Sequence, residues 1–513
     1  MAVARTRSIA LLGLAGSVVE VEADLSAQLP AFVIIGLPDT ALGEARDRVR
    51  SAATNAGCPL PQRRLTVNLS PAALPKHGSG FDLAIAVACL AASQLVSADS
   101  VARVVHLGEL GLDGRLRPID GILPSVVAAA RAGCDTVMVP TGNAEEARLV
   151  PEVTVVPVAS LRDAALWHGG EFEPREVEPV RATARTEPST AADGDLADIV
   201  GNESAVAGLL VAAAGGHHLL LLGPPGAGKT MLASRLPGLL PDLDTEAALE
   251  VASIRSLAGR EVGTALARRP PFEAPHHTAT AAAMVGGGSR LIRPGAVARA
   301  SHGVLFLDEA PEFPMTVLDV LRQPLESGAI AIHRANAVAS FPARFLLVLA
   351  ANPCPCGAAG SMSDPCRCTS MVKRRYLGRL SGPLLDRIDL QMWVPRITIA
   401  SMRLAGQQNG MSSAAARVKV AAARAVARER LRNTRWQTNA QMTGAWLRGE
   451  GKLHPGTRAT KSLDRALELG NITMRGYDRV LKVAWTVADL DSAAAPTADH
   501  VGQALYLRKG ITR

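Results

Sequence analysis

The stretch at residues 219–230, LLLLGPPGAGKT, decides the fold of the chain around it. Four leucines predict a buried strand, and the next residues satisfy the pattern G-x-x-x-x-G-K-[ST] before a helical segment. Glycines let backbone N–H groups wrap a phosphate, and the helix N-terminus adds a positive dipole. The sequence therefore predicts a nucleotide site formed by Gly223, Pro224, Pro225, Gly226, Ala227, Gly228, Lys229, Thr230 and Met231.

A second apolar strand, GVLFLDE at residues 303–309, ends in two carboxylates. Because the carboxyl ends of neighbouring parallel strands meet at one edge of a sheet, we expect Asp308 and Glu309 beside the phosphates. Thr230 and Asp308 are expected to hold Mg²⁺, and Lys229 is expected to reach the terminal phosphates of ATP. Glu309 is expected to orient the attacking water. The pair therefore predicts ATP hydrolysis rather than nucleotide binding alone.

The order of these motifs resembles the AAA+ ATPases and, within them, their magnesium-chelatase-like branch. The resemblance includes LLVLAAN at 346–352 and SGPLLDRIDL at 381–390. It implies that Asn352 senses the γ-phosphate and that Arg387 is an arginine finger for the nucleotide of a neighbouring subunit. A finger that acts in trans implies a homo-oligomeric ring, by resemblance a hexamer.

The resemblance also assigns roles before and after the core motifs. Arg475, in ITMRGYDRVLKVAWTVADL, matches the second sensor on a helical lid. The segment DIVGNESAV at 198–206 resembles the family's adenine-side segment, which makes Ile199 and Val200 candidate contacts of the base. For Arg387 and Arg475, a surface ion pair is the alternative interpretation.

Four parts are expected along the chain. Alternating strand-like and helix-like runs over 1–170 predict an α+β domain, and the charged, proline-containing segment 171–195 predicts a linker. Buried-strand runs alternate with helical segments over 196–395. Residues 396–513 show Ala, Leu and Arg at helical spacing. The expected fold class is α/β, with an AAA+ P-loop parallel sheet core, an N-terminal α+β domain and a C-terminal all-helical lid domain.

Two N-terminal segments resemble the active-site segments of Lon-type proteases, LPKHGSGFDLAIA and GELGLDGRLRPIDGILPSVVAAARAG. Those proteases use a serine–lysine dyad, but the matching positions here hold Gly80 and Leu123. Ser79 lies one residue away without a matched lysine. The resemblance therefore implies a degenerate Lon-protease-like domain that is not an active protease. With the cysteine loop described next, it narrows the family to the ComM/YifB group, for which it implies DNA remodelling.

Four of the seven cysteines crowd into the loop NPCPCGAAGSMSDPCRC, as two C-x-C pairs nine residues apart. Four thiolates on one short loop suit a tetrahedral structural Zn²⁺, which would also order a polar segment. Reduced thiols without metal and a redox disulfide pair are the alternatives. The proposed ligands are Cys354, Cys356, Cys366 and Cys368, whereas Cys58, Cys89 and Cys134 are expected in cores.

The positive charge of the chain is concentrated at one end. Residues 1–400 carry 36 Lys and Arg against 39 Asp and Glu, whereas 401–513 carry 19 against 8. A basic domain on a near-neutral body favours a polyanion partner, although a solvated Arg-rich helix face is the commoner meaning. Aromatic residues make up only 3% of the chain, so binding of single-stranded or branched DNA should be backbone-directed and sequence-independent.

Further basic residues are candidate contacts of the DNA backbone. Arg290, Arg293 and Arg299 belong to a segment that resembles the family's inserted pore-facing loop and also contains His276 and His277. The cysteine loop is followed by the basic run Lys373, Arg374, Arg375 and Arg379, for which a solvated basic turn is the alternative.

Three functions remain open on these residues. The first is an ATP-driven DNA motor, as in ComM-like branch migration or helicase activity. The alternatives are a magnesium-chelatase-type ATPase subunit and a regulatory AAA+ ATPase acting on a protein partner. Few and unevenly spaced cysteines favour the cytoplasm, and the absence of a long clean apolar stretch argues against a membrane partner.

Overall fold

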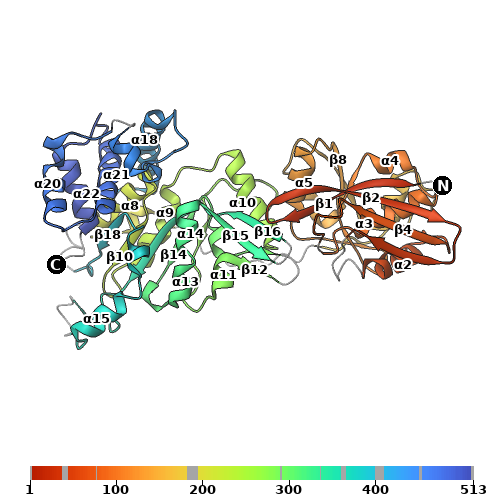
Figure 1. The fold of residues 1–513 in the computed structure, drawn as a ribbon, viewed down its shortest axis with the longest axis horizontal. Helices are drawn as coiled ribbons and strands as arrows, with labels where there is room; N and C mark the ends of the chain where they lie inside the picture. The colour runs from red at the N-terminus through yellow and green to blue at the C-terminus, as the bar shows by residue number, and fades with distance from the viewer. Residues whose placement is uncertain are drawn as a thin grey trace.

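Two large β-sheets organise the chain, one in the N-terminal part and one in the centre, with helices at the far end (Figure 1). The structure, a computed structural model, describes residues 3–36, 44–76, 78–181, 194–288, 292–334, 337–359, 366–398, 410–449 and 453–509. The N-terminal sheet, the central sheet and the helical end follow one another along the long axis of the molecule (Figure 1).

The N-terminal sheet has seven strands in the order β3-β4-β2-β1-β5-β8-β9 and mixes parallel with antiparallel pairs. Buried residues alternate along β4 (Arg64–Ser70), so one face of this strand packs against a core. The other strands are β1 (Ala4–Leu12), β2 (Ala15–Ser26), β3 (Ala31–Ile35), β5 (Val105–His106), β8 (Thr136–Pro140) and β9 (Thr154–Val158). Four of the helices beside them are α2 (Ala45–Asn55), α3 (Asp82–Ala92), α5 (Ile122–Arg131) and α7 (Leu161–Trp167).

The central sheet has five parallel strands in the order β11-β14-β17-β10-β18. All residues of its three middle strands are buried, as expected of a parallel sheet covered by helices on both faces. The strands are β10 (Leu219–Leu222), β11 (Phe272–Glu273), β14 (Val304–Leu307), β17 (Leu346–Ala351) and β18 (Leu390–Trp393). The longer helices of this part are α8 (Glu203–Gly215), α9 (Lys229–Leu239) and α10 (Thr245–Leu257).

Smaller elements surround the central sheet. A hairpin of β15 (Ala329–Arg334) and β16 (Ala337–Pro342) lies on its N-terminal side, where Gly13 pairs with Ser340. The short helices are α11 (Ala281–Val285), α12 (Ala296–Arg299), α13 (Met315–Asp319), α14 (Arg322–Ser327) and α16 (Gly382–Leu385). Helix α15 (Ser370–Leu377), which follows the cysteine loop, projects from the body below the central sheet (Figure 1).

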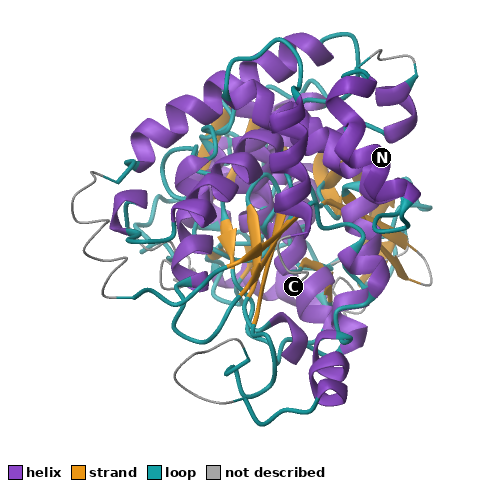
Figure 2. Cartoon of the chain, turned by 90° about the vertical axis from the view of Figure 1, so that its left-hand side faces the viewer, coloured by secondary structure: helices purple, strands orange, loops and turns teal. Residues whose placement is uncertain are grey.

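The described residues after β18 form helices without a further strand, which confirms the predicted helical lid (Figure 2). They are α18 (Ser413–Leu431), α19 (Gly444–Arg448), α20 (Thr457–Glu468), α21 (Met474–Leu490) and α22 (Ala498–Lys509). Val480, Leu481 and Ala484 of α21 share one hydrophobic cluster with Leu219 and Val348 of the sheet. The lid is therefore packed directly on the sheet that carries the glycine-rich loop.

Helix α10 belongs to both the central part and the N-terminal part. Its Leu249 and Ala252 join the hydrophobic cluster of Ile122 and Leu123 of α5. The Gly121 N–H donates to the carbonyl of Ser256 at 3.1 Å, and the Leu123 N–H donates to the Ser256 hydroxyl at 3.3 Å. The two parts are thus joined by a continuous apolar core with backbone hydrogen bonds across it.

The predicted fold class is confirmed, whereas the boundaries of the four predicted parts stay a prediction. Residues 182–193 of the predicted linker and residues 399–409 lie outside the described residues. None of the helices in the described ranges combines the length and the hydropathy that crossing a bilayer requires.

Candidate active site

The glycine-rich loop connects β10 to α9 at the carboxyl edge of the central sheet. Gly226 and Gly228 have φ values of +74° and +87°, a left-handed conformation that disfavours residues with a Cβ. At Gly223 a Cβ would lie 2.2 Å from the carbonyl oxygen of Val394. The glycines therefore set the shape of this loop, and it ends at the N-terminus of α9, where backbone N–H groups and the helix dipole favour an anion.

Lys229 begins α9 and is largely buried, with its ammonium turned back onto the loop. Its Nζ donates to the carbonyls of Gly223 at 2.7 Å and Pro224 at 2.9 Å, and to Oδ1 of Asn352 at 3.0 Å. Burial lowers the pKa of Lys229, while Asp308 and Glu309 act in the opposite direction. The structure thus brings together Lys229 and Asn352, which the sequence separates widely.

The residues predicted to hold Mg²⁺ are adjacent. The hydroxyl of Thr230 donates to Oδ2 of Asp308 at 2.7 Å, across the gap between α9 and the end of β14. A hydroxyl and a carboxylate at this separation fit a small hard cation, which takes one or two protein oxygens together with phosphate oxygens. Thr230 and Asp308 are therefore suited to hold Mg²⁺ between the loop and the strand.

Glu309 adopts a left-handed backbone conformation directly after β14, with φ 50° and ψ 43°. Its N–H donates to Oδ1 of Asp308 at 2.9 Å, and this hydrogen bond offsets part of the free-energy cost of the left-handed conformation. The Glu309 side chain is about half exposed, and its Oε2 lies 3.7 Å from Nδ1 of His277. The turn therefore presents Glu309 toward solvent beside Asp308, where it could act on a water molecule.

The adenine-side candidates lie next to the loop. Ile199 follows the short 3₁₀ helix η2 (Leu196–Asp198) and packs partly buried against the core beneath the loop. Val200 is half-buried, and Met231 is exposed on α9. The amide of buried Asn202 donates to the Ala227 carbonyl at 3.4 Å. Sequence reasoning missed Asn202, although it lies within the segment DIVGNESAV that indicated this region.

The two predicted arginines differ in their surroundings. Arg387 forms an ion pair with Glu326 and donates to the carbonyl of Pro383 at 2.5 Å. Its Nε is buried without a hydrogen-bond acceptor among the described residues. Arg475 is exposed in the first turn of α21. None of the partners of Arg387 belongs to the nucleotide motifs of its own chain, so its role in trans stays a prediction.

A buried polar network behind Arg387 was not predicted from the sequence. Arg479 of α21 donates to the backbone carbonyl of Arg387 at 3.1 Å and forms an ion pair with Asp389. Nδ1 of His217 lies 3.1 Å from Asp389. Burial disfavours the ionised form of Asp389, but Arg479 and the neighbouring histidines outweigh it and hold its pKa well below the usual range. The network ties the segment that carries Arg387 to the lid.

The four loop cysteines converge. Sγ of Cys354 lies 3.3 Å from that of Cys356 and 3.6 Å from that of Cys366, and Cys368 lies 3.4 Å from Cys356. All four sulfurs lie within 4.8 Å of one another. A tetrahedral Zn²⁺ with sulfurs at about 2.3 Å requires sulfur separations of about 3.8 Å, so the arrangement fits such a site. The N–H of Ala358 and the neighbouring thiols lower the pKa of Cys356 to about 6, which favours a thiolate.

The predicted core cysteines and pore-loop residues also have defined places. Cys58, Cys89 and Cys134 are buried, as expected. Arg293 forms a 2.7 Å ion pair with Asp120 of the N-terminal part, and Arg299 pairs with Glu273 at 3.0 Å. Arg290 lies outside the described residues. Arg293 and Arg299 are therefore engaged within the chain rather than presented as free DNA contacts.

The positions that match the Lon dyad carry other contacts. Leu123 is buried against α10, and Gly80 lies in the turn before α3. Ser79 donates to Glu109, and the buried Lys76 donates to three backbone carbonyls, the nearest that of Pro71 at 2.6 Å. Ser79 and Lys76 are thus each engaged with groups other than one another.

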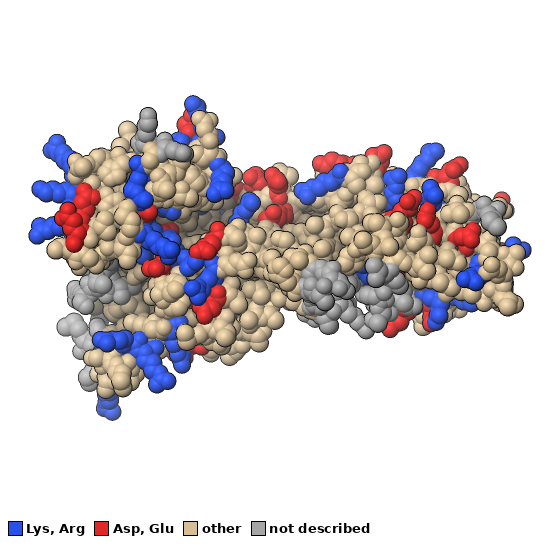
Figure 3. Space-filling view, viewed as in Figure 1, with Lys and Arg blue, Asp and Glu red and all other residues tan. Residues whose placement is uncertain are grey.

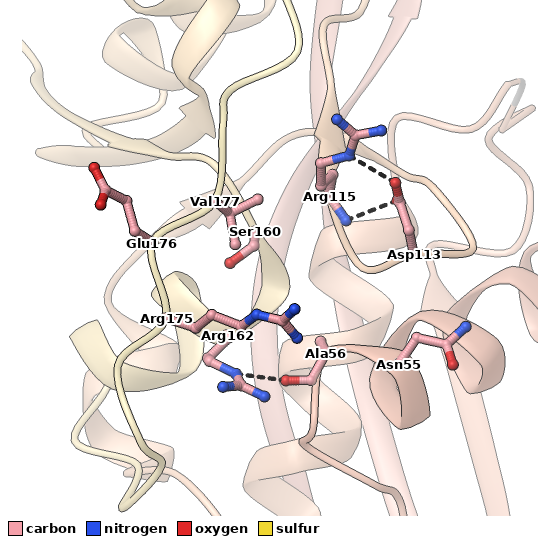
Figure 4. A pocket seen from close by; sticks show the side chains of 9 residues that line it. All are labelled: Asn55, Ala56, Asp113, Arg115, Ser160, Arg162, Arg175, Glu176 and Val177. Atoms are coloured by element: carbon pink, nitrogen blue, oxygen red, sulfur yellow. Dashed lines mark hydrogen bonds and ion pairs between the residues drawn. The ribbon is translucent and has the colours of Figure 1, made fainter.

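A pocket in the N-terminal part contains none of the predicted site residues (Figure 4). Arg115, Arg162 and Arg175 line it. Arg115 bonds Asp113 at 2.6 Å, and Arg162 donates to the carbonyl of Ala56 at 2.6 Å (Figure 4). Two of its three guanidinium groups are thus already partnered, and we assign it no role in the nucleotide site.

The five-stranded parallel sheet, the glycine-rich loop and the Asp–Glu pair at the end of β14 define an AAA+ ATPase. Three family descriptions match the chain: "Subunit ChlI of Mg-chelatase" over residues 21–143, "Magnesium chelatase, subunit ChlI" over 195–402, and its C-terminal part over 410–508. The chain belongs to this magnesium-chelatase-like family, in the group of ComM and YifB. Membership implies an ATPase that uses ATP and Mg²⁺.

Similar proteins cover nearly the whole chain. An uncharacterized protein of Mycobacterium tuberculosis is 49% identical over 99% of both chains. The competence protein ComM of Haemophilus influenzae is 42% identical over 99% of this chain and 98% of its own. YifB of Escherichia coli is 40% identical over 97% and 96%. A Lon protease of Mycolicibacterium smegmatis is 29% identical over 187 residues, 34% of this chain and 23% of the protease.

Proposed function

We propose that this protein is an ATP-hydrolysing AAA+ motor, assembled as a homo-hexameric ring, that binds and remodels DNA. The observation that carries ATP hydrolysis is the convergence of Lys229, Thr230, Asp308 and Asn352 through two short contacts at the carboxyl edge of one sheet. We expect the phosphates of a bound nucleotide to replace the carbonyl and amide oxygens to which Lys229 now donates hydrogen bonds.

Each residue has a proposed part in the reaction. Lys229 and the loop N–H groups bind the phosphates, and Thr230 and Asp308 hold Mg²⁺, which neutralises charge that develops on the phosphate oxygens. Glu309 orients the attacking water, and Asn352 contacts the γ-phosphate. The remaining proposed contacts are Arg475 from the lid, Arg387 from the neighbouring subunit, and Ile199, Val200 and Met231 around the nucleotide.

The proposal of a DNA partner is supported by the placement of basic side chains. Helix α15 projects from the body, and Lys and Arg side chains gather around it and at the outer edge of the lid (Figure 3). Arg374 and Arg375 lie in the last turn of α15, and Met371 of the same helix is exposed. An isolated basic projection can lie against a phosphate backbone without reading bases, which predicts salt-sensitive binding.

The cysteine cluster, defined as Cys354, Cys356, Cys366 and Cys368, is proposed to hold one structural Zn²⁺. The sulfur separations support a tetrathiolate site. A cytoplasmic setting is proposed because it keeps these thiols reduced. The N-terminal part is proposed to lack protease activity because Gly80 and Leu123 supply neither nucleophile nor base.

A second candidate is a chelatase-type ATPase subunit, and the observation that favours it is the match of three chelatase descriptions along one chain. A regulatory ATPase acting on a protein is a third. The deciding measurement is the steady-state ATPase rate with and without single-stranded and branched DNA at low and raised salt. Salt-sensitive stimulation supports the DNA motor, whereas a rate indifferent to every DNA transfers the proposal to a porphyrin-linked or protein-linked ATPase.

A further inference from the structure

The cysteine cluster lies against three segments of the nucleotide site. Cys354 follows Asn352 by two residues, so the first C-x-C pair continues directly from the predicted γ-phosphate sensor. The turn closes with a 2.9 Å hydrogen bond from the Gly357 N–H to the Cys354 carbonyl. The position of Asn352 and the shape of the cluster are therefore linked through a very short length of backbone.

The second contact is with the glycine-rich loop. Gly357 has φ +74°, and a Cβ there would lie 2.5 Å from Cδ and Cγ of Pro225. The backbone of the cysteine turn thus touches the proline ring of the loop that cradles the phosphates. A change in the turn would displace Pro225 directly, because no flexible side chain separates the two segments.

The third contact returns from the far side of the cluster. Helix α15 follows Cys368, and the hydroxyl of its buried Tyr376 lies near the backbone N–H of Asn352. Burial, with Glu312 and Glu309 nearby, raises the pKa of Tyr376 to about 12, so its hydroxyl stays protonated. Arg379, just beyond α15, donates to the carbonyl of Pro311 at 3.0 Å, in the 3₁₀ helix η3 (Ala310–Glu312) that follows Glu309.

We propose that the metal-loaded cysteine cluster positions Asn352 and the glycine-rich loop, so that ATP turnover depends on the metal. This inference rests on the proposed ATPase function and on Zn²⁺ binding by the cluster. The metal joins the turn after Asn352 to the segment that leads into α15, and α15 holds the Asn352 backbone from the other side. Without the metal, only the intervening backbone connects the two C-x-C pairs, and Gly357 and α15 lose the support that fixes their places. In this arrangement Tyr376 is a positioning residue, because it acts on the nucleotide through Asn352.

The test uses the full-length chain and separates the metal from the contact. The Cys354→Ala/Cys366→Ala double variant removes two ligands, and Cys58→Ala/Cys134→Ala is the matched control with two buried cysteines outside the cluster. Tyr376→Phe keeps all four cysteines and removes only the hydroxyl that lies near the Asn352 N–H. Bound zinc, affinity for a fluorescent ATP analogue, and kcat and KM are measured for each. Reconstitution of the apo protein with Co²⁺ reports tetrathiolate geometry from its visible absorption bands, independently of activity.

We expect about one zinc per wild-type chain and per Tyr376→Phe chain, and none in the cluster double variant. The double variant should lose at least tenfold in kcat and should also bind the ATP analogue more weakly, because both Asn352 and the glycine-rich loop lose their support. Tyr376→Phe should lose about threefold to tenfold in kcat with KM nearly unchanged, because it removes a polar neighbour of the Asn352 backbone and no nucleotide contact. The control double variant should match the wild type in all readouts.

Three results overturn different parts of the inference. If wild-type protein is metal-free under reducing conditions and shows no tetrathiolate Co²⁺ spectrum, the cluster does not bind a metal. Unchanged kcat in both the metal-free variant and Tyr376→Phe would show that the cluster does not affect ATP turnover, while the proposed ATPase function would still stand. No ATP hydrolysis by zinc-loaded wild-type protein, with or without DNA, overturns the proposed function itself. Because Tyr376→Phe retains the ligands, the coupling is tested even if the cluster double variant does not fold.

Discussion

The glycine-rich loop and the Lon-like segment around Gly121 both place a glycine in the left-handed conformation directly before a helix, but the two helices begin with different kinds of side chain. Gly228 caps α9 at φ +87°, and Gly121 caps α5 at φ +80°. The first turn of α9 carries Lys229 and Thr230 toward the other nucleotide motifs, whereas the first turn of α5 buries Leu123 against α10. A helix N-terminus that follows a left-handed glycine is therefore not a functional site by itself. The side chains of its first turn determine whether it binds a ligand or packs against another domain.

The strongest way to break this comparison is Lys229→Ala. The variant loses the ammonium that bonds both the loop and Asn352, so ATP affinity should fall about a hundredfold or more and hydrolysis should disappear. Titration with a fluorescent ATP analogue measures the loss, with the exposed Lys419→Ala of α18 as control. Tight binding by Lys229→Ala would mean that the loop alone holds the phosphates.

Arg387→Ala should keep nucleotide binding and lose about a thousandfold or more in kcat, the effect typical of a missing arginine finger. Mixing this variant with Lys229→Ala should restore part of the rate, because each supplies the half-site that the other lacks. The two variants are assayed alone and in defined mixtures. Mixtures as inactive as their components would contradict a finger that acts between subunits.

Glu309→Gln should bind ATP normally and lower kcat about a hundredfold to ten-thousandfold, because the amide cannot accept a proton from water. Glu312→Gln is the matched control, since Glu312 lies on the same turn but pairs with Arg379. Single-turnover hydrolysis measures both. Substantial turnover by Glu309→Gln would remove Glu309 from its proposed role and leave Asp308 as the only acidic group of the site.

Asp389→Asn should loosen the lid from the sheet, with a loss of about 2–3 kcal/mol in the local free energy of unfolding, because the half-buried Arg479 loses its charged partner. Hydrogen exchange in α21 measures this loss, and Asp386→Asn is the control. The depressed pKa of Asp389 means that its stabilisation is present above the unfolded pKa of about 3.9 and is lost only as the pH falls through the lower folded value. Equal exchange in both variants would show that the network does not hold the lid.

The smallest expected effect concerns the contact beside Leu123. Burial raises the pKa of Glu146 to about 7, although the nearby Ser256 hydroxyl and Leu123 N–H act in the opposite direction, and one carboxylate oxygen has no partner in the described structure. A raised carboxyl pKa stabilises the fold fully below the unfolded value of about 4.3, and this stabilisation is lost as the pH rises through 7. Glu146→Gln should therefore be more stable than wild type at pH 8 by about 1–3 kcal/mol, with no gain at pH 4.

Thermal unfolding across pH 4–8 measures the difference between wild type and Glu146→Gln. The exposed neighbour Glu145→Gln is the control, since its charge lies in solvent. A wild-type profile as flat as that of Glu146→Gln would show that Glu146 is not protonated at the contact. The result sharpens the opening comparison, because it reports how tightly the segment around Leu123 is packed against the ATPase core.

Local patterns were enough to predict the parallel sheet and the placement of its site. The runs LLLLG and LFLDE each combine an apolar strand with the polar residues that follow it, so strand edge and chemistry are read together. The convergence of the four loop cysteines was equally predictable, because all four lie on one loop. The helical lid followed from its Ala, Leu and Arg spacing.

Contacts between segments that are distant in the sequence could not be predicted. Asp389 pairs with Arg479 and His217, and nothing in the spacing of three such common residues indicates that they are buried together. Arg293 and Arg299 were predicted as DNA contacts because their segment resembles a pore-facing loop; that role stays a prediction, and in the structure Asp120 and Glu273 pair with them. The sequence does not show which group pairs with a charged side chain, and that pairing determines whether the side chain is available to a ligand.

Helix α10 has a consequence for any attempt to divide this protein. A cut in the predicted linker at 171–195 would separate the two parts in sequence but leave Leu249 and Ala252 embedded beside Ile122 and Leu123. Nicked chains should therefore stay associated through size-exclusion chromatography and melt in a single transition. An ATPase fragment expressed from residue 196 onward would carry that apolar helix face naked into solvent and should aggregate. The N-terminal part therefore shields an apolar surface of the ATPase part from solvent.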